Sequence, residues 1–578
     1  MRKLSVIITI LTLALMSTVG IVSATPVDEL TSLAEYAPEG SPVFAVIRTD
    51  AGYIETLDGL AARLSAAVGQ PMGDSSVTDL IDLALRGLPT VVPASAPTDF
   101  ATDIRPWLGD SVAVMLTGLD MNMDPTQSIV FALSVSDNAA AEAWANDYGT
   151  LVGWGVPVET EDGLFYDMRN NNNSAVLLAD GVMFVGLATA LETVVMPGDD
   201  LVNLTQTSEF TDVIGALPED DYNALVYIDG ELLITEIAPF FEMMSGQSPG
   251  TIESMGMGSI EDMAGMAGQQ AMGLTLLEGR SLVMDYAIAG NETEYTQSPV
   301  DLSILEHIPA DTILAAVNSG AGDMVNQFFV ALEMLDQMMT ENDMTMSEMG
   351  DLPPALDIIN FNSLSVFIRQ MYEGTTGLNL DETLDLLNGT NALYVSIDPQ
   401  DVQGLTVPVP SPGVLFMTDD ADASAAYVES MAGIVTDIFA NATFEDGVLT
   451  LPANELGLVV PEEFREIVAL LDMQLASGDG MIVFGRPATV GYALDPQGAN
   501  LTDIGTYEYE SGLFLEDPTS VWLINVPPVI APLIDFLTES GMATESDIEM
   551  LESLLQIVAT SSITTSENNA RFTITLTQ

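Results

Sequence analysis

A series of short motifs occurs twice along this chain in the same order, and this repetition constrains the fold more than any other feature. In the first and second halves its members are Pro38 and Pro309, Trp107-Leu-Gly109 and Leu387-Asn-Gly389, Asp180-Gly181 and Asp479-Gly480, Asn203-Leu-Thr205 and Asn500-Leu-Thr502, and the apolar segments 225–229 and 521–525. Chance does not preserve the order of so many anchors. The sequence therefore predicts two tandem homologous repeats, residues 25–297 and 298–578.

Each predicted repeat combines short apolar strands with amphipathic helices. Val325, Phe328 and Leu332, for example, keep a helical period in the second repeat. The segments 271–289 and 558–577 each predict a closing hairpin. Consecutive strands with tight turns favour antiparallel pairing, so we expect the α+β class: two repeats, each a mostly antiparallel sheet packed by amphipathic helices on one side.

The first 24 residues predict a signal peptide. Arg2 and Lys3 form a positive start, residues 4–15 are an apolar run too short to span a bilayer comfortably, and Val22-Ser23-Ala24 supplies small residues for cleavage. An uncleaved N-terminal anchor is the alternative. With cleavage near Ala24, we expect a secreted, extracellular or periplasmic protein with no transmembrane segment in the mature chain.

The charge of the chain is extreme. Its 578 residues include 85 Asp and Glu against 12 Lys and Arg, which gives a formal net charge of −73 at pH 7. Such a surface repels nucleic acid and anionic lipid, so we exclude both as partners. It also destabilises a compact state through self-repulsion unless cations screen it. Cations are therefore possible partners, although an acidic composition also serves solubility alone.

Several kinds of catalytic centre are excluded by composition. The chain has no cysteine, which removes disulfides, thiol catalysis and Cys-ligated metals. His307 is its single histidine, so a Ser-His-Asp triad and a multi-His metal site are also excluded. The first repeat has Tyr36 at the position of His307, which favours a structural role for both residues. We predict neither catalytic residues nor a cofactor.

Two acidic clusters are candidate calcium sites. Asp120, Asn122 and Asp124 begin like an EF-hand loop, but Pro125 and Phe131 stand where that loop requires glycine and glutamate. A polar turn between strands is the competing interpretation.

The second cluster, Asp419, Asp420 and Asp422, lies between a predicted strand and a predicted helix. Capping of the helix N-terminus is the simpler role there, because carboxylates accept hydrogen bonds from the first free N–H groups.

Methionine is concentrated in two segments, 243–272 and 334–349. Thioethers are soft ligands suited to Cu(I), but they are also pliable packing groups on adaptable apolar surfaces. Packing between helix and sheet, or a flexible cover over an apolar ligand, is the interpretation we favour.

The anchors of the first repeat also resemble a known bacterial family, domain of unknown function 3352. The resemblance rests on Pro38 with the strand after it, on 106–114 (Pro-Trp-Leu-Gly-Asp-Ser-Val-Ala-Val), and on the strand and Ala-rich helix at 131–148. It extends over most of the mature chain, but the second repeat departs from the pattern at Leu387-Asn-Gly389. The resemblance implies export and architecture and no particular chemistry.

These observations lead to one main functional hypothesis and two alternatives. The main hypothesis is an exported, non-catalytic cell-surface or extracellular protein with a structural or binding role. The first alternative is a carrier that holds an apolar, lipid-like small molecule between sheet and helices. The second is a hydrolase that uses carboxylates, although the spacing of acids in so acidic a chain cannot identify a catalytic pair.

Overall fold

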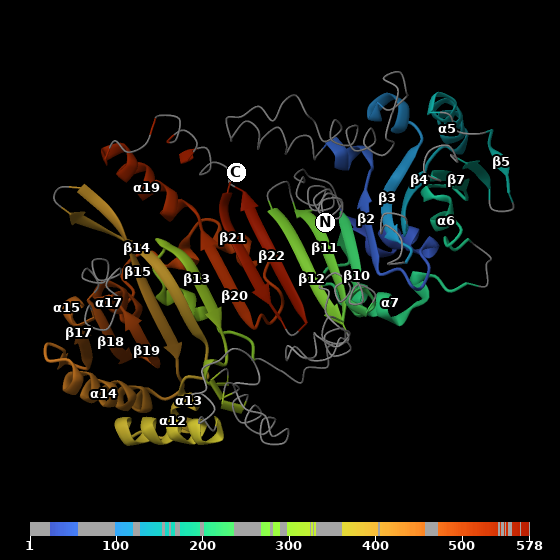
Figure 1. Ribbon diagram of the computed structural model, residues 1–578. Coiled ribbons are helices and arrows are strands. Elements are labelled where there is room, and N and C mark those ends of the chain that lie inside the picture. Colours follow the sequence, from blue (N-terminus) through green and yellow to red (C-terminus); the bar gives the residue numbers. More distant parts are fainter. Residues whose placement is uncertain are drawn as a thin grey trace, which may run out of the picture. The chain divides into compact units, whose positions relative to one another are not determined.

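The computed structural model describes the chain in separate stretches (Figure 1). They are residues 24–55, 99–118, 128–152, 156–160, 163–167, 174–196, 201–235, 268–277, 281–289, 298–323, 325–326, 329–330, 361–402, 405–456, 472–540, 544, 548, 551–552, 558–566 and 568–576. Residues 1–23 of the predicted signal peptide lie outside them. The chain divides into two compact units. Unit 1 comprises Met1–Glu294 and Asn568–Gln578, and unit 2 comprises Tyr295–Glu567.

Unit 1 is built on one antiparallel sheet. Its strands run in the order β5-β6-β7-β8-β4-β3-β2-β10-β11-β12-β22. Their bounds are β2 (Val43–Arg48), β3 (Leu108–Leu116), β4 (Ile129–Val135), β5 (Val158–Glu159), β6 (Leu164–Asp167), β7 (Ser174–Ala179), β8 (Val182–Leu187), β10 (Ala224–Asp229), β11 (Gln269–Leu277), β12 (Ser281–Ala289) and β22 (Asn569–Leu576). A short ribbon pairs β1 (Thr25–Pro26) with β9 (Asp221–Tyr222). The last strand of the chain thus completes the sheet of the first unit.

Apolar residues cover both faces of this sheet, because alternate residues of a strand point to opposite sides. Val130 and Ala132 of β4 belong to one core, with α2 (Val27–Leu30), η1 (Thr31–Tyr36), α6 (Ala188–Leu191), η4 (Leu204–Gln206) and α7 (Ser208–Gly215). Leu133 and Val135 pack on a second core, with η2 (Phe100–Ile104) and α5 (Asn138–Val152). The expectation of helices on one side is therefore wrong for unit 1.

Unit 2 has a sheet of its own, in the order β16-β17-β18-β19-β15-β14-β13-β20-β21. The bounds are β13 (Thr312–Asn318), β14 (Asn391–Val402), β15 (Leu405–Met417), β16 (Thr443–Glu445), β17 (Val448–Leu451), β18 (Met473–Gly478), β19 (Met481–Gly485), β20 (Ser520–Asn525) and β21 (Val558–Thr565). The two units share a strand order: β2 lies between β3 and β10 in unit 1, and β13 lies between β14 and β20 in unit 2. Every pairing among the described strands is antiparallel, as expected.

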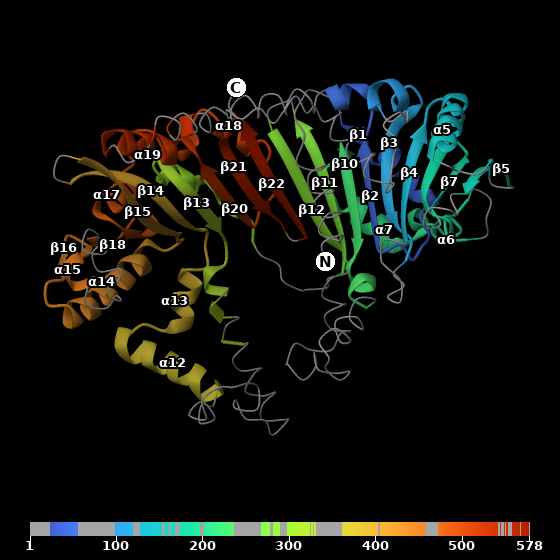
Figure 2. The same ribbon diagram turned by 45° about the horizontal axis from the view of Figure 1, so that its top comes forward.

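The core of unit 2 lies against η5 (Leu302–His307), α17 (Pro487–Leu494) and η8 (Leu501–Asp503). The other helices among the described residues of unit 2 are α12 (Phe361–Thr376), α13 (Leu380–Leu386), α14 (Ala421–Ile438), α15 (Ala453–Leu456), α18 (Tyr507–Ser511) and α19 (Pro527–Ser540). Helix α14 contacts β16 to β19 (Figure 2), whereas α19 contacts β13, β14 and β15.

Two sequence motifs form the same local structure in both units. Asp180 and Gly181 have φ angles of 46° and 78°, and Asp479 and Gly480 have 47° and 77°. Positive φ at both central residues is the requirement of a type I′ hairpin turn, which Asp-Gly adopts readily. Asn203 and Asn500 each cap a short 3-10 helix, and each of these helices returns a side chain to the cap.

Candidate functional site

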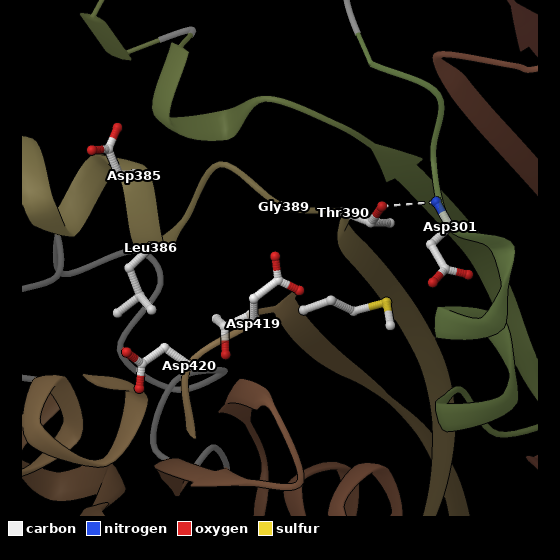
Figure 3. Close-up of a pocket in the computed structure, with 9 residues that line it drawn as sticks. Asp301, Asp385, Leu386, Gly389, Thr390, Asp419 and Asp420 are labelled. Atoms are coloured by element: carbon white, nitrogen blue, oxygen red, sulfur yellow. Dashed lines mark hydrogen bonds between the residues drawn. The ribbon is translucent and has the colours of Figure 1, made fainter. Parts of the chain in front are cut away.

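A pocket of about 330 Å³ lies in unit 2, where β14 begins and β15 ends (Figure 3). Four of its residues are aspartates: Asp301, Asp385, Asp419 and Asp420. They come from separate elements, since Asp301 precedes η5, Asp385 lies near the end of α13, and the other two join β15 to α14. Leu386, Gly389, Thr390, Met417 and Thr418 form the rest of the lining.

Backbone hydrogen bonds hold these elements together. The Met417 amide donates to the carbonyl of Thr390 at 2.8 Å, which joins the ends of the two strands. The Asp301 amide donates to the hydroxyl of Thr390, also at 2.8 Å, which fixes the start of η5 beside β14. These bonds place Asp301, and the end of β15 that leads into Asp419 and Asp420, beside the start of β14.

Two of the four carboxylates cap helices. Asp420 accepts a hydrogen bond from the Ala423 amide at 2.8 Å at the N-terminus of α14, as the capping interpretation predicted. Asp301 accepts one from the Ser303 amide at 2.9 Å at the start of η5. Among the described residues, no hydrogen bond engages the carboxylates of Asp385 and Asp419, so those two oxygen pairs remain available to a ligand.

The pocket carries a strong negative field. The N-terminus of α14 contributes about half a positive charge, whereas four ionised carboxylates supply roughly four negative ones. Carboxylates outweigh the helix dipole, so the pocket attracts ammonium or guanidinium groups and repels anions.

The predicted calcium ligands have different outcomes. Asp419 and Asp420 both line the pocket, but Asp422 lies in the first turn of α14 and is not part of the lining. Within the described stretches, no three His, Asp or Glu side chains are grouped closely enough to hold a metal ion. Asp120, Asn122 and Asp124 lie outside the described residues. So do both methionine-rich segments, apart from residues 268–272 at the start of β11. Calcium binding at both clusters stays a prediction.

A buried ion network lies in unit 1. The guanidinium of Arg571 on β22 donates to both carboxylate oxygens of Asp285 on β12, at 2.6 and 2.9 Å. It also donates to Glu219 at 2.7 Å. The side chain of Asp285 is 0% exposed and that of Arg571 is 7% exposed, whereas Glu219 is 51% exposed. The Arg571–Asp285 pair is therefore a desolvated, bidentate ion pair between adjacent strands.

Tyr222 completes the network. Its hydroxyl donates to Asp285 at 2.9 Å and accepts from the Glu219 amide at 2.9 Å. Burial, followed by the charge of Asp285, raises the pKa of Tyr222. Hydrogen bonds and the charges of Asp285 and Glu219 raise the pKa of Arg571, against the opposing effect of burial. Tyr222 and Arg571 thus keep their protons at any physiological pH.

Sequence reasoning missed this network. It placed 271–289 and 558–577 in separate closing hairpins and gave no reason for them to pair. The available signal was an arginine at an inward position of a strand, in a chain that has 12 basic residues in total. An arginine in such a place needs a buried carboxylate as its partner.

His307 has the structural position that the sequence suggested. Its Nδ1 lies 2.8 Å from the carbonyl oxygen of Ala493 on α17. Because a carbonyl can only accept, Nδ1 carries the proton. The hydrogen bond joins η5 to α17 beside the core of unit 2, away from the lining of the acidic pocket.

Comparison with known families assigns the chain. The family described as Protein of unknown function (DUF3352) matches residues 4–346, which is more than half of the sequence. The chain belongs to this family. The DUF3352 match includes all the anchors on which the resemblance rested in the first repeat. Of the residues that line the acidic pocket, it includes Asp301 and ends before the others. No curated protein and no solved structure matches the chain.

The helices were also compared with the length and hydropathy that a bilayer span requires. No helix in the described part of the chain meets both conditions.

Proposed function

We propose that this DUF3352 protein is an exported, non-catalytic binding protein built from two tandem homologous repeats. The non-catalytic part is supported by the structural use of the buried ionisable groups. Among the described residues, every clearly shifted pKa belongs to a tyrosine or to Arg571, and every one is raised.

Catalytic acids and bases need pKa values near the working pH, and active sites shift them in that direction. A raised pKa moves tyrosine and arginine further from neutrality. Tyr53, Tyr222 and Tyr394, for instance, are buried in the sheets, and burial is the main cause of their shifts. These shifts stabilise one protonation state in each core, which supports a structural use of the buried ionisable groups.

The repeat proposal is supported by correspondences between the units. Pro38 forms an isolated bridge with Asn203, and Pro309 forms one with Asn500. In each pair the proline precedes the first long strand of its unit, and the asparagine caps a 3-10 helix. Common strand order, common Asp-Gly turns and these bridges all favour descent of the two units from one ancestral repeat.

A binding role is supported by the acidic pocket. It is open, it is held by strand ends, and two of its carboxylates have no hydrogen bond from a described residue. Its four aspartates do not suit an apolar ligand, because an apolar group cannot satisfy a desolvated carboxylate. The pocket therefore favours a cationic ligand over the lipid carrier of the alternative hypothesis.

Export and catalysis can be tested with the same preparation. The full-length gene is expressed in a bacterial host with an intact general secretion pathway, and the N-terminus of the protein found outside the cytoplasm is sequenced. We expect Thr25 as the first residue; full-length protein confined to the cytoplasm would contradict export.

The purified protein is then tested against ester, glycoside and peptide substrates. We expect no turnover by the wild type. Turnover that disappears in Asp385→Asn and Asp419→Asn variants would establish the carboxylate hydrolase instead. Ser430→Ala, outside the pocket lining, serves as the control substitution.

A further inference from the structure

One face of the unit 2 sheet carries a row of apolar side chains that crosses five strands. The strand register pairs Trp522 of β20 with Ala316 of β13, Ala316 with Leu393 of β14, Leu393 with Val414 of β15, and Val414 with Phe484 of β19. Directly paired residues point to the same face of a sheet. We call these five residues the apolar row.

The apolar row is exposed at three places. Leu393 is 47% exposed, and Trp522 and Phe484 are each 42% exposed. Ile524, two residues beyond Trp522 on the same face, is 40% exposed. Together these four side chains present on the order of 300 Å² of apolar surface, the size at which a patch on a monomer is often functional.

The opposite face of the same strands is fully buried. Val521, Leu523, Tyr394 and Val483 alternate with the exposed residues and are at most 5% exposed in the core of unit 2. The exposed side chains therefore all lie on one face of the sheet. On that face Ala316, inside the apolar row, and Ile482, two residues before Phe484 on β19, are each only 2% exposed.

Charge limits what can cover the apolar row. Unit 2 contains three arginines, Arg369, Arg465 and Arg486, and no lysine. Arg369 forms an ion pair with Asp381, and Arg486 is only 9% exposed, while Arg465 lies outside the described residues. Cationic side chains are therefore scarce in unit 2, and the whole chain has a net charge of −73, which disfavours a second copy of this chain and an anionic membrane as the occupant.

The acidic pocket lies along the same strands. Thr418 and Gly389 line it, four residues from Val414 on β15 and from Leu393 on β14, respectively. At about 3.4 Å per residue, four residues along a strand place the pocket roughly 14 Å from the apolar row. A helical segment of about nine residues is therefore long enough to reach from the apolar row to the acidic pocket.

We propose that the apolar row docks a cationic, amphipathic polypeptide segment of a partner protein, with a basic side chain of that segment in the acidic pocket. The apolar face of the segment would cover Leu393, Trp522 and Phe484. Its ammonium or guanidinium group would pair with Asp385 and Asp419, whose carboxylates no described residue engages. This inference rests on the proposed binding role and specifies the class of partner.

The probe for the test is an 18-residue Leu/Lys peptide whose leucines lie on one face of a helix. A peptide of the same composition in scrambled order has the same charge without an apolar face, and a Leu/Glu peptide has the face with the opposite charge. Binding to the full-length chain is followed by fluorescence anisotropy of the labelled peptide and by the emission of Trp522, with Trp522→Phe as the control for the second signal.

Two variants locate the binding surface. Leu393→Ser combined with Trp522→Ser removes apolar contacts, and Asp385→Asn combined with Asp419→Asn removes charge without touching the helix caps. Ile438→Ser, at a side chain 67% exposed near the end of α14, is the matched control. Hydrogen exchange of the β14 and β20 peptides verifies that each variant is folded.

We expect the amphipathic cationic peptide to bind with a blue shift of the tryptophan emission, and each double variant to weaken its binding at least tenfold. Ile438→Ser should leave the affinity unchanged. Equal binding of the scrambled peptide would overturn the proposal, because it would show charge attraction without docking. Absence of binding, self-association through the same residues, or preference for vesicles of zwitterionic phosphatidylcholine would overturn it as well.

Failure of this inference can be distinguished from failure of the proposed function. Export with cleavage at Ala24 and absence of turnover would persist if only the partner class were wrong.

Discussion

Removal of the Arg571 side chain from the network in unit 1 should unfold that unit more readily. In Arg571→Met, Asp285 would remain 0% exposed with its charge matched only by the hydroxyl of Tyr222. Breaking one partner out of a buried ion pair costs about 3–5 kcal/mol. Loss of the contact to Glu219 adds at most about 1 kcal/mol, because that carboxylate is 51% exposed and screened by solvent.

The expected shift of the melting temperature follows from this cost. A unit of this size loses roughly 2–4 °C per kcal/mol, so the transition of unit 1 should fall by about 10 °C. Hydrogen exchange gives the local measurement. Peptides from β11, β12 and β22 should lose protection by about a hundredfold or more, whereas peptides from β13 and β14 in unit 2 should change little.

Two further variants decide whether the cause is the unpaired charge. Arg571→Met combined with Asp285→Leu removes both charges, so much of the stability should return. Arg369→Met breaks the ion pair with Asp381, whose side chain is 66% exposed, and should cost less than about 1 kcal/mol. If Arg571→Met left unit 1 as stable as the wild type, or if the double variant were no better than the single one, the reasoning would be refuted.

Three other outcomes follow from the structure. The pKa of Tyr222 is raised, so the folded state keeps a proton that the unfolded chain loses above the ordinary tyrosine pKa of about 10. The contribution of Tyr222 to stability should therefore be full below that pH and fall above it. In urea titrations, Tyr222→Phe should lose less stability at alkaline pH than the wild type does. Gly273→Ala places a methyl group 2.3 Å from the ring of Tyr222 and should destabilise unit 1 by about 1–3 kcal/mol. Gly433→Ala in α14 meets nothing within 4 Å and should stabilise unit 2 by up to about 1 kcal/mol. Chemical denaturation that ranks the two variants in the opposite order would contradict this. The melting temperature of the wild type should rise between low and molar NaCl, because screening relieves the repulsion of a net charge of −73, and a flat response would count against self-repulsion.

Local structure followed closely from residue type. The Asp-Gly pairs at 180 and 479, which the sequence marked as recurring anchors, both adopt positive φ at the two residues of the turn. Asp420, placed between a strand and an Ala-rich segment, predicted an N-cap, and the carboxylate caps α14. These features depend on interactions within a few residues, so the neighbouring sequence is sufficient to specify them.

Long-range packing did not follow in the same way. The segments that form β12 and β22 were recognised as strands, but their pairing joins residues almost three hundred positions apart. Alternating apolar residues permit a strand to pair with many others, and the sequence alone does not select the partner. The second core of unit 1 was missed for the same reason, because a strand with both faces apolar was taken as covered on one side.

The sequence by itself determined the antiparallel class of the sheets, the positions of turns and caps, the membership of the family and the negative charge of the whole chain. These properties are sums or local patterns, and each residue contributes to them without reference to distant ones. Only the tertiary structure decided that Arg571 finds Asp285, that four aspartates from three segments share one pocket, and that the apolar row stays exposed. Those features depend on which strand lies beside which, and that choice is made by burial of the whole core, where for example the ring of Tyr222 lies over Gly273.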